Sequence, residues 1–422
     1  MSITLILVAL LAFYVAWNLG ANDVANSMGT SVGSKAITLK QAIIIAGILE
    51  FTGAVLFGQE VSQTLATKIA NPILFAATPE IYVTGMIAVL ITCGLWLQIA
   101  TSRGLPVASS HAVVGAIAGF SWVAVGVDAI NWSSIGLVTI GWIFTPIISS
   151  AIAALFYSQI KHWILDQPNQ VAQLQQWIPW LSVTLLGIFG VIVLPSLMQP
   201  LTNYLNQHIG LNLPNYDIPL FTGAVTAIAL TVTSWRQLEP VEDTADKEQI
   251  LPNPVERLFG RFQVISACFV AFAHGSNDVG NAIAPLAAII HTNRTGSVPI
   301  NGITIPIWIL ILGGAGIVAG LAIWGKNVIA TIGENIITLQ PSSGFCAELA
   351  TATTILLASR FGLPVSTSHA LVGGVVGIGL VQNIKSIKFP TLQRIALAWI
   401  ITLPVSAILS ATIFSTARIF FL

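Results

Sequence analysis

Apolar stretches long enough to cross a lipid bilayer recur along almost the whole chain. A helix needs about 20 apolar residues to span the hydrocarbon core, because each residue adds only about 1.5 Å. Twelve such stretches are present, at residues 3–25, 41–58, 81–100, 105–127, 134–157, 180–198, 218–235, 262–290, 303–325, 345–359, 364–382 and 395–421. Backbone groups in lipid need hydrogen-bond partners within the segment, so the pattern predicts an all-α integral membrane protein with about twelve transmembrane segments.

The composition supports this class. Only 8% of the 422 residues are charged and 55% are hydrophobic, whereas about 25% of a soluble protein is charged. The net charge is zero, which gives no reason to expect a nucleic-acid partner. Cys93, Cys268 and Cys346 lie in apolar sequence and are interpreted as small buried residues, not as a disulfide framework or a metal site.

One long polar segment divides the chain. Residues 236–261 contain six of the sixteen acidic side chains, together with three prolines, which is typical of an exposed linker. We therefore predict a first transmembrane repeat at 1–160, connecting helices at 161–235, a cytoplasmic linker at 236–261 and a second repeat at 262–422. The first apolar stretch lacks the positive region of a cleaved signal peptide and is expected to be a retained helix.

Two polar motifs occur twice inside the apolar sequence. The Asn-Asp motif reads GANDVANS at 20–27 and GSNDVGNA at 275–282. The hairpin motif reads TSRGLPVASSH at 101–111 and SRFGLPVSTSH at 359–369. The motifs keep their order, with offsets of 255 and 258 positions, so they predict a two-fold internal repeat, which is how many secondary transporters are built.

The number of segments predicts that the two repeats are inverted. The two copies of the Asn-Asp motif lie in the first and the eighth stretch, so seven crossings separate the starts of the repeats. An odd number reverses the direction in which the chain crosses the membrane. Positive residues favour the inside. With both termini outside, the inner side carries Lys35, Lys40, Arg103, Lys161, Arg236, Lys247, Arg257, Arg261, Lys326, Lys385, Lys388 and Arg394. The outer side then keeps only Lys68, Arg294, Arg360 and Arg418.

The Asn-Asp motifs are candidates for a cation site. Carboxylate and amide oxygens suit a hard cation such as sodium, and a helix broken at the flanking Gly20 or Gly275 would add main-chain carbonyls. The glycines could instead let another backbone approach closely. A carboxylate at the bilayer centre costs about 3 kcal/mol on insertion scales, so two matched copies favour function over a polar contact between helices. The candidate cation ligands are Asp23, Asp278, Asn26 and Asn281.

The hairpin motifs are candidates for an anion site. Proline interrupts a helix, and each motif then resumes with hydroxyl residues whose free backbone N–H groups suit an oxyanion. The surrounding stretches, 81–127 and 345–382, could form re-entrant hairpins. The alternative is that the hydroxyls only cap helices. His111 and His369 are more typical of buried packing residues than of substrate or proton carriers.

Two further acidic residues and several glycines are less specific. Glu50 and Glu348 lie in apolar sequence without acidic counterparts in the other half, so each is either a further cation ligand or a structural carboxyl. Small residues at helical spacing predict close helix packing; they are Gly313, Gly314, Gly316 and Gly320, Gly115 and Gly119, and Gly373 and Gly377.

Charge balance favours symport. Two ionised aspartates and a bound anion would make a strongly negative cluster, and neither Asn-Asp motif contains a basic residue. Cations that enter with the anion would neutralise it, and so would protons, which leaves the coupling ion open.

The Asn-Asp motif and the hairpin motif, each present twice, resemble the sequence motifs of the PiT family of inorganic phosphate transporters. The resemblance covers nearly the whole chain. It implies twelve helices in inverted repeats, a phosphate site near the midplane, and cotransport with sodium or, in some bacterial and plant members, with protons. It also implies that the protein is not an enzyme and has no resident cofactor. Family members are often homodimers, and some relatives are sulfate permeases.

The resemblance also assigns roles to individual positions. It places phosphate against Asn22, Asn277, Ser109, Ser110, Thr367 and Ser368. It places the cation, most simply sodium, against Asp23 and Asp278, with Asn26, Asn281 and Ser366 nearby. Ala108 stands where the second copy has Ser366, so the halves are not expected to contribute equally.

We therefore expect a phosphate–sodium symporter in the lipid bilayer of a cell membrane. The alternatives are a proton-coupled phosphate or sulfate permease and, from another class, an intramembrane hydrolase. The hydrolase is disfavoured because serine and histidine are adjacent in each hairpin motif, and neighbours on a helix point about 100° apart.

Overall fold

The computed structural model describes residues 3–103, 107–208, 214–238, 253–300, 302–325 and 337–421. Within these ranges the chain is built from helices, and the one pair of residues bridged in β fashion, Ala70 and Ile130, forms no strand. The α-helices are α1 (Ile3–Gly33), α2 (Leu39–Phe57), α3 (Gln59–Thr67), α4 (Pro79–Ser102), α5 (Ser109–Val125), α6 (Trp132–Ile160), α7 (Gln170–Ile192), α8 (Leu194–His208), α9 (Asp217–Leu238), α10 (Pro254–Thr295), α11 (Ile307–Ile323), α13 (Pro341–Arg360), α14 (Thr367–Gln382) and α15 (Phe389–Phe421). Short helical turns lie at Pro72–Phe75, Val127–Ala129, Lys161–Leu165 and Ile384–Ser386.

The predicted all-α class is confirmed, but the described helices do not reproduce twelve full spans. Eight are long and apolar enough to cross a membrane, namely α1, α2, α4, α6, α7, α9, α10 and α15. The apolar helices α5, α11 and α14 are shorter, at 16 to 17 residues. Helix α13 is long enough but carries serine, threonine and Glu348 on its buried faces. The stretch predicted at 180–198 is divided between α7 and α8.

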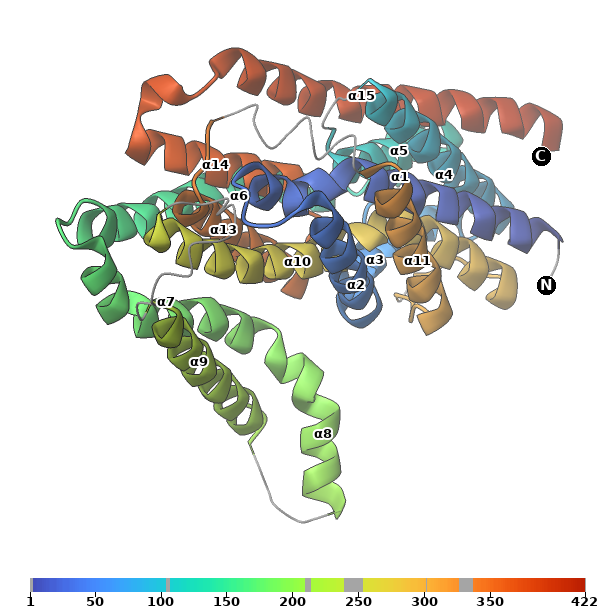
Figure 1. The fold of residues 1–422 in the computed structure, drawn as a ribbon. Coiled ribbons are helices and arrows are strands. Elements are labelled where there is room, and N and C mark those ends of the chain that lie inside the picture. Colours follow the sequence, from blue (N-terminus) through green and yellow to red (C-terminus); the bar gives the residue numbers. More distant parts are fainter. Residues whose placement is uncertain are drawn as a thin grey trace.

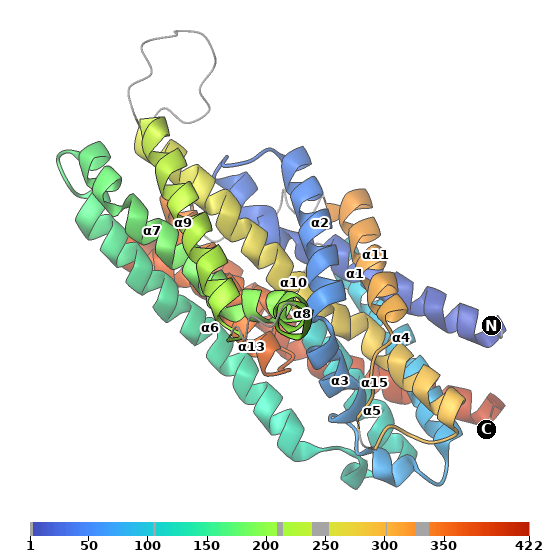
Figure 2. The same cartoon turned by 90° about the horizontal axis from the view of Figure 1, so that it is seen from below.

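The two helices that carry the Asn-Asp motifs lie at the centre of the protein and run in opposite directions (Figure 1). Helix α10 packs against α1, α2, α3, α4 and α13, and α1 also packs against α11. Both chain termini lie at one end of the helix bundle, and the end of α9 and the start of α10 lie at the other (Figure 2).

The hairpin motifs join two pairs of neighbouring helices. Helix α4 packs against α5 and α13 packs against α14, and each second helix also packs on a long helix, α5 on α15 and α14 on α6. The second helices begin at Ser109 and Thr367, which confirms the predicted restart with hydroxyl residues. Residues 104–106 of the first hairpin motif lie outside the described residues.

Close helix packing is the role of the predicted glycines. A Cβ on Gly119 would lie 2.1 Å from the carbonyl oxygen of Ala407, and one on Gly377 would lie 2.2 Å from that of Ser150. These contacts join α5 to α15 and α14 to α6, so the backbones meet where only a hydrogen fits.

The predicted helix break at the Asn-Asp motifs is wrong. Helices α1 and α10 continue through both motifs without interruption. The flanking glycines provide close approach instead: a Cβ on Gly20 would lie 1.9 Å from the carbonyl oxygen of Ile317, and one on Gly275 would lie 2.0 Å from that of Glu50. An unbroken helix keeps its carbonyls hydrogen-bonded, so the polar groups available at these motifs are side chains.

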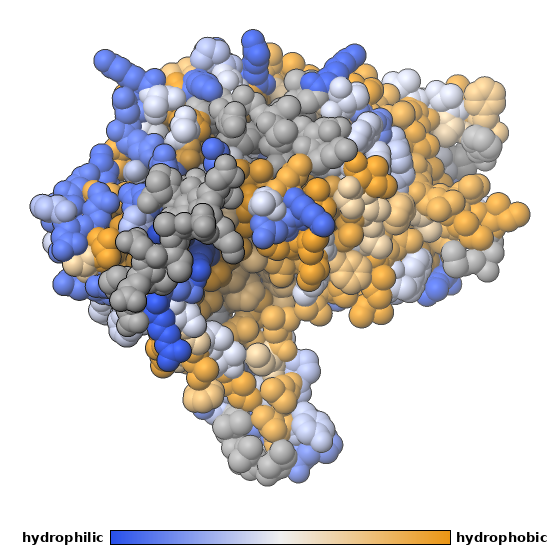
Figure 3. Space-filling view, in the orientation of Figure 1, coloured by the Kyte–Doolittle hydropathy of each residue, from blue (hydrophilic) through white to orange (hydrophobic). Residues whose placement is uncertain are grey.

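The surface and the linker fit a membrane protein. Hydrophobic residues cover most of the face in Figure 3, and hydrophilic residues gather toward the end where α6 meets α7. Helices α8 and α9 extend away from the other helices in Figure 1. The predicted linker at 236–261 is shorter in the structure, because its flanks belong to α9 and α10, and residues 239–252 lie outside the described residues.

Candidate substrate and cation site

The carboxyl groups of the two Asn-Asp motifs meet inside the protein. Asp23 of α1 and Asp278 of α10 are both buried, and one side-chain oxygen of each lies within 4.8 Å of the other and of a ring nitrogen of His274. The packing of α1 against α10 brings them together. Two carboxylates at this separation repel each other in a low-dielectric interior unless a positive charge lies between them.

A histidine that the sequence analysis missed lies next to these carboxyls. His274 Nε2 is 3.0 Å from Asp278 Oδ2, and His274 Nδ1 is 3.1 Å from Glu50 Oε2. Glu50 of α2 also accepts a hydrogen bond of 2.8 Å from Ser27. The signal was in the sequence: His274 precedes Asp278 by four residues and therefore lies on the same face of a helix. The sequence left open whether Glu50 is a further cation ligand or a structural carboxyl. The structure places it in this buried cluster.

Two hydroxyl residues hold the first asparagine of each Asn-Asp motif. Asn22 donates a 2.9 Å hydrogen bond to Thr101 Oγ1, and Asn277 donates a 2.9 Å bond to Ser359 Oγ. Thr101 and Ser359 occupy the same position of the hairpin motif. The Asn-Asp motif of each half is thus tied to the hairpin motif of the same half, a link that spacing could not reveal.

The starts of α5 and α14 contact the second Asn-Asp motif. Thr367 donates a 2.9 Å bond to Asp278 Oδ2, and Asn281 donates a 3.2 Å bond to Ser109 Oγ. The second contact joins the two halves, because Ser109 belongs to the first hairpin motif. In the first motif Asn26 donates a 3.1 Å bond to Asp23.

Four buried oxygen atoms at this place lack a hydrogen-bond partner among the described residues. They are Asp23 Oδ2, Ser110 Oγ, Asn277 Oδ1 and Asn281 Oδ1. Buried polar atoms in native proteins are almost always paired, and leaving one unpaired costs about 1–3 kcal/mol. Three of them belong to the two Asn-Asp motifs, and Ser110 follows Ser109, which contacts Asn281. Unpaired buried oxygens in matched motifs are a property of a site that binds a polar ligand.

The serines of the second hairpin motif have a structural role as well. Ser366 accepts a bond from the His369 backbone N–H and so caps α14, and its hydroxyl lies 2.9 Å from that of Ser368. Ala108, at the matching position before α5, makes no side-chain cap. The described contacts of Ser366 are therefore with its own helix, and the two halves differ in how the second helix of the hairpin is capped.

Comparison with known proteins identifies the chain. The model of the phosphate transporter family matches residues 19–410, a range that contains both copies of both motifs. The chain belongs to this phosphate transporter family. Its relatives are membrane transporters, and phosphate is the substrate of the family.

Individual phosphate transporters match over almost their full length. A putative phosphate permease of Haemophilus influenzae is 38% identical over 98% of this chain and 96% of its own. Inorganic phosphate transporter 2-1 of Arabidopsis thaliana, a chloroplast protein, is also 38% identical, over 95% of this chain and 70% of its own. A solved structure of a sodium-dependent phosphate transporter is 34% identical and superposes with a TM-score of 0.87 over 99% of each chain.

In this member of the phosphate transporter family Glu348 lies in a separate polar cluster. Thr30 and Ser31 each donate a 2.6 Å bond to its carboxyl, and Ser266 and Gln263 donate bonds of 2.8 and 3.2 Å. The donors come from the end of α1 and the start of α10. Four donors stabilise a buried carboxyl without a counter-ion, so Glu348 joins three helices of the fold.

The two histidines of the hairpin motifs meet between the two halves of the chain. Their ring centroids are 4.9 Å apart. His111 Nδ1 bonds the carbonyl of Trp399 at 3.1 Å, and His369 Nδ1 bonds the carbonyl of Trp142 at 3.0 Å. Each ring also packs on the other tryptophan, at 3.8 and 3.7 Å between centroids. These histidines bond backbone carbonyls across the halves, and no described hydrogen bond joins either ring to a serine hydroxyl.

Proposed function

We propose that this chain imports inorganic phosphate by symport with sodium. The observation that carries the proposal is the meeting of Asp23 and Asp278, from helices of opposite direction, beside the hydroxyl-bearing starts of α5 and α14. Carboxylates suit a cation, and hydroxyls at helix starts suit an oxyanion. A site that holds both kinds of group is suited to binding both solutes together.

The anion is assigned to the hydroxyl and amide groups. Ser109, Ser110, Thr367 and Ser368 lie at the first turns of two helices, where backbone N–H groups have no partner within the helix. Phosphate, with four oxygens, can accept several such bonds at once. The amides of Asn22 and Asn277, held by Thr101 and Ser359, present a fixed orientation for the same ligand.

The charge of the buried cluster explains why a cation accompanies phosphate. Asp23, Asp278 and Glu50 bring three carboxyl groups together around the single imidazole of His274, so the cluster would carry a net negative charge with all three carboxyls ionised. Adding an anion to this cluster is unfavourable in a low-dielectric interior without further positive charge. Sodium bound by Asp23 and Asp278 supplies it, and the similar solved structure is of a sodium-dependent transporter.

The proposal extends to the arrangement in the membrane. We infer two inverted repeats of one fold with twelve crossings in all, both termini outside and the polar linker in the cytoplasm of a cell, as the distribution of basic residues favours. The placement of both termini at one end of the bundle supports this arrangement (Figure 2). The active form is a homodimer, and the site opens alternately to each side.

A proton-coupled permease is the second candidate, and one observation favours it. His274 lies between two buried carboxyls at 3.0 and 3.1 Å, an arrangement that can accept and release a proton during transport. Sulfate is the alternative anion, because it has the same tetrahedral shape as phosphate.

Uptake by the purified protein in liposomes tests the proposal and both alternatives. We expect an inward sodium gradient to raise the initial rate of labelled phosphate uptake at least about tenfold over an equal potassium gradient, since coupling supplies the driving force. Labelled sulfate should not enter. Uptake that ignores sodium and follows an imposed proton gradient would instead establish the second candidate.

Removing the hydroxyl that holds Asn22 tests its role in phosphate binding. We expect Thr101→Val to weaken the apparent affinity for phosphate about three- to tenfold, because a buried hydrogen bond contributes about 0.5–1.5 kcal/mol. Thr101→Ser is the matched control, since serine occupies the equivalent position, Ser359, in the second half. Equal affinity in both variants, or equal loss in both, would contradict the assigned role.

A further inference from the structure

The helices that follow the two hairpin turns are each held by a long helix of the other half. Helix α14 packs along α6, and α5 packs along α15 (Figure 1). Carbonyl oxygens at every fourth position of the long helix meet residues of the shorter one. On α6 and α14 the pairs are Trp142 with His369, Pro146 with Gly373 and Ser150 with Gly377. On α15 and α5 they are Trp399 with His111, Leu403 with Gly115 and Ala407 with Gly119. The same register in both pairs interlocks the two halves.

Trp142 makes two hydrogen bonds to the turn that opens α14. Its carbonyl oxygen bonds His369 Nδ1 at 3.0 Å, and its indole Nε1 donates a 3.1 Å bond to the carbonyl oxygen of Pro364. The proton of the first bond is on His369 Nδ1, because a carbonyl oxygen can only accept. The side chain of Trp142 is buried, so bulk water does not compete for these bonds. The two bonded positions lie five residues apart and enclose the hydroxyls of Ser366, Thr367 and Ser368.

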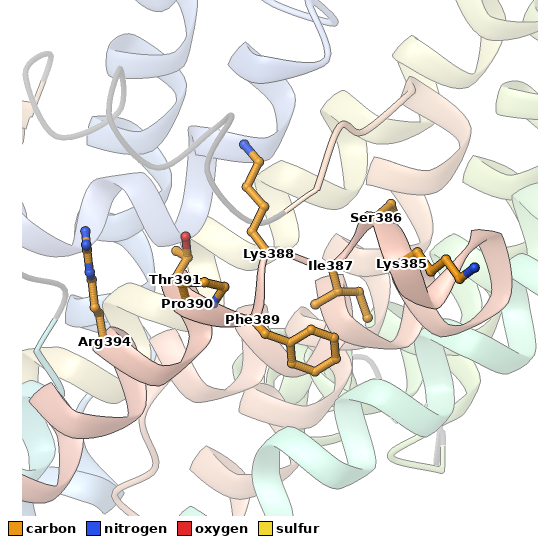
Figure 4. A pocket seen from close by; sticks show the side chains of 8 residues that line it. All are labelled: Lys385, Ser386, Ile387, Lys388, Phe389, Pro390, Thr391 and Arg394. Atoms are coloured by element: carbon orange, nitrogen blue, oxygen red, sulfur yellow. The ribbon is translucent and has the colours of Figure 1, made fainter.

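The other end of α14 is held independently of Trp142. Figure 4 shows the turn between α14 and α15, where Lys388 points away from Ile387 and Phe389. Ile387 is buried, and a Cβ on Gly379 of α14 would lie 2.6 Å from Ile387 Cγ1. Close packing thus fixes the middle and the far end of α14. The bonds of Trp142 act on its first turn, which carries the hydroxyls.

We propose that Trp142 is a positioning residue for the phosphate site. It holds Pro364 and His369, and it thereby sets where the hydroxyls between them meet the anion. The inference rests on the proposed function, which assigns phosphate to the hydroxyls of this turn. Thr367 of the turn donates a 2.9 Å bond to Asp278, so a shift of the turn displaces a group that contacts the second Asn-Asp motif. A side chain of the first half therefore sets the geometry of a binding element of the second half.

Trp142→Phe tests this role, because phenylalanine keeps an aromatic ring and removes the indole N–H. We expect the KM for labelled phosphate in liposomes to rise about threefold to tenfold, the usual contribution of one buried hydrogen bond. The maximal rate per inserted protein should stay within about twofold, since the lost interaction serves binding. Trp235→Phe is the matched control: it also removes an indole bond to a main-chain carbonyl, that of Gln175 at 2.7 Å, but between α9 and α7.

The control should leave the KM for phosphate unchanged. An equal rise of KM in Trp142→Phe and Trp235→Phe would overturn the proposal. So would a lower unfolding temperature of Trp142→Phe with an unchanged KM, because the bond would then serve stability alone.

A second pair of variants tests the other end of the turn and does not require Trp142→Phe to fold. The side-chain amide of His369→Asn can donate from about the position of the imidazole Nδ1, so its KM should stay within about twofold of the unaltered protein. His369→Leu cannot donate and should raise KM as Trp142→Phe does. Equal KM values for the two His369 variants would contradict the proposal. If the unaltered protein carries labelled sulfate in place of phosphate, the proposed function is refuted, and the KM values of the same variants for sulfate then decide the role of Trp142.

Discussion

Replacing Asp278 with asparagine is expected to reduce sodium-driven phosphate uptake at least about 100-fold while the protein still inserts and remains folded. Asparagine keeps the shape of the side chain and its bond with Thr367, but it removes the negative charge that we assign to the cation. Loss of one ionic partner in a buried site corresponds to about 3–5 kcal/mol, which is more than a factor of 100. Asp23→Asn should have the same effect, because Asp23 Oδ2 has no protein partner among the described residues.

The measurement is the initial rate of labelled phosphate uptake in liposomes, normalised to the amount of inserted protein. Asp128→Asn and Asp217→Asn are matched controls, since both carboxyls are exposed, and both should transport normally. Normal uptake by both Asp23→Asn and Asp278→Asn would remove the central cation site from the proposed function.

Gly275→Val is expected to prevent correct assembly of the protein, and Gly20→Val is expected to do the same. The new Cβ would lie 2.0 Å from the carbonyl oxygen of Glu50 in the first variant and 1.9 Å from that of Ile317 in the second. The obstructing atoms belong to the backbone of a packed helix and cannot rotate away. We expect the free energy of unfolding to fall by more than about 3 kcal/mol, the upper range for overpacking. Little monodisperse protein should remain after extraction in detergent.

The contacts are reciprocal, which strengthens this expectation. A Cβ on Gly53 of α2 would lie 2.1 Å from the carbonyl oxygen of Phe272 in α10, so α2 and α10 each need a glycine where they cross. Gly136→Val and Gly187→Val are the controls, because nothing lies within 4 Å of a Cβ at either position. Size-exclusion chromatography and thermal unfolding of the four variants make the comparison. Monodisperse Gly275→Val protein with an unchanged unfolding temperature would show that the helices can separate at this crossing.

Much of the polar site could be anticipated because it is local in sequence. The restart of a helix after Gly-Leu-Pro-Val depends on proline and on hydroxyl residues a few positions apart, and α14 begins at Thr367 as these rules predict. The repetition of the motifs also indicated that Asp23 and Asp278 would share one place. The glycines at helical spacing correctly predicted close packing, because only glycine permits backbones to touch.

The helix break at the Asn-Asp motifs was predicted wrongly for a physical reason. A glycine between apolar helical segments can either end a helix or let another backbone approach, and the same sequence is compatible with both. The outcome depended on Ile317 and Glu50, which belong to other helices. His274 was overlooked for a related reason. Nothing in its neighbouring residues indicates a polar cluster, and its role becomes visible only when α2 places Glu50 3.1 Å from its ring.

By itself the sequence determined the helical class, the membrane environment, the two repeated motifs and the family, because each depends on composition or on residues close together in the chain. The tertiary structure alone decided that α1 and α10 stay unbroken, that Thr101 and Ser359 hold the asparagines, and that His274 bridges two carboxyls. These features are contacts between helices distant in sequence, and the energy of such a contact depends on distance and burial, which appear only when the helices pack.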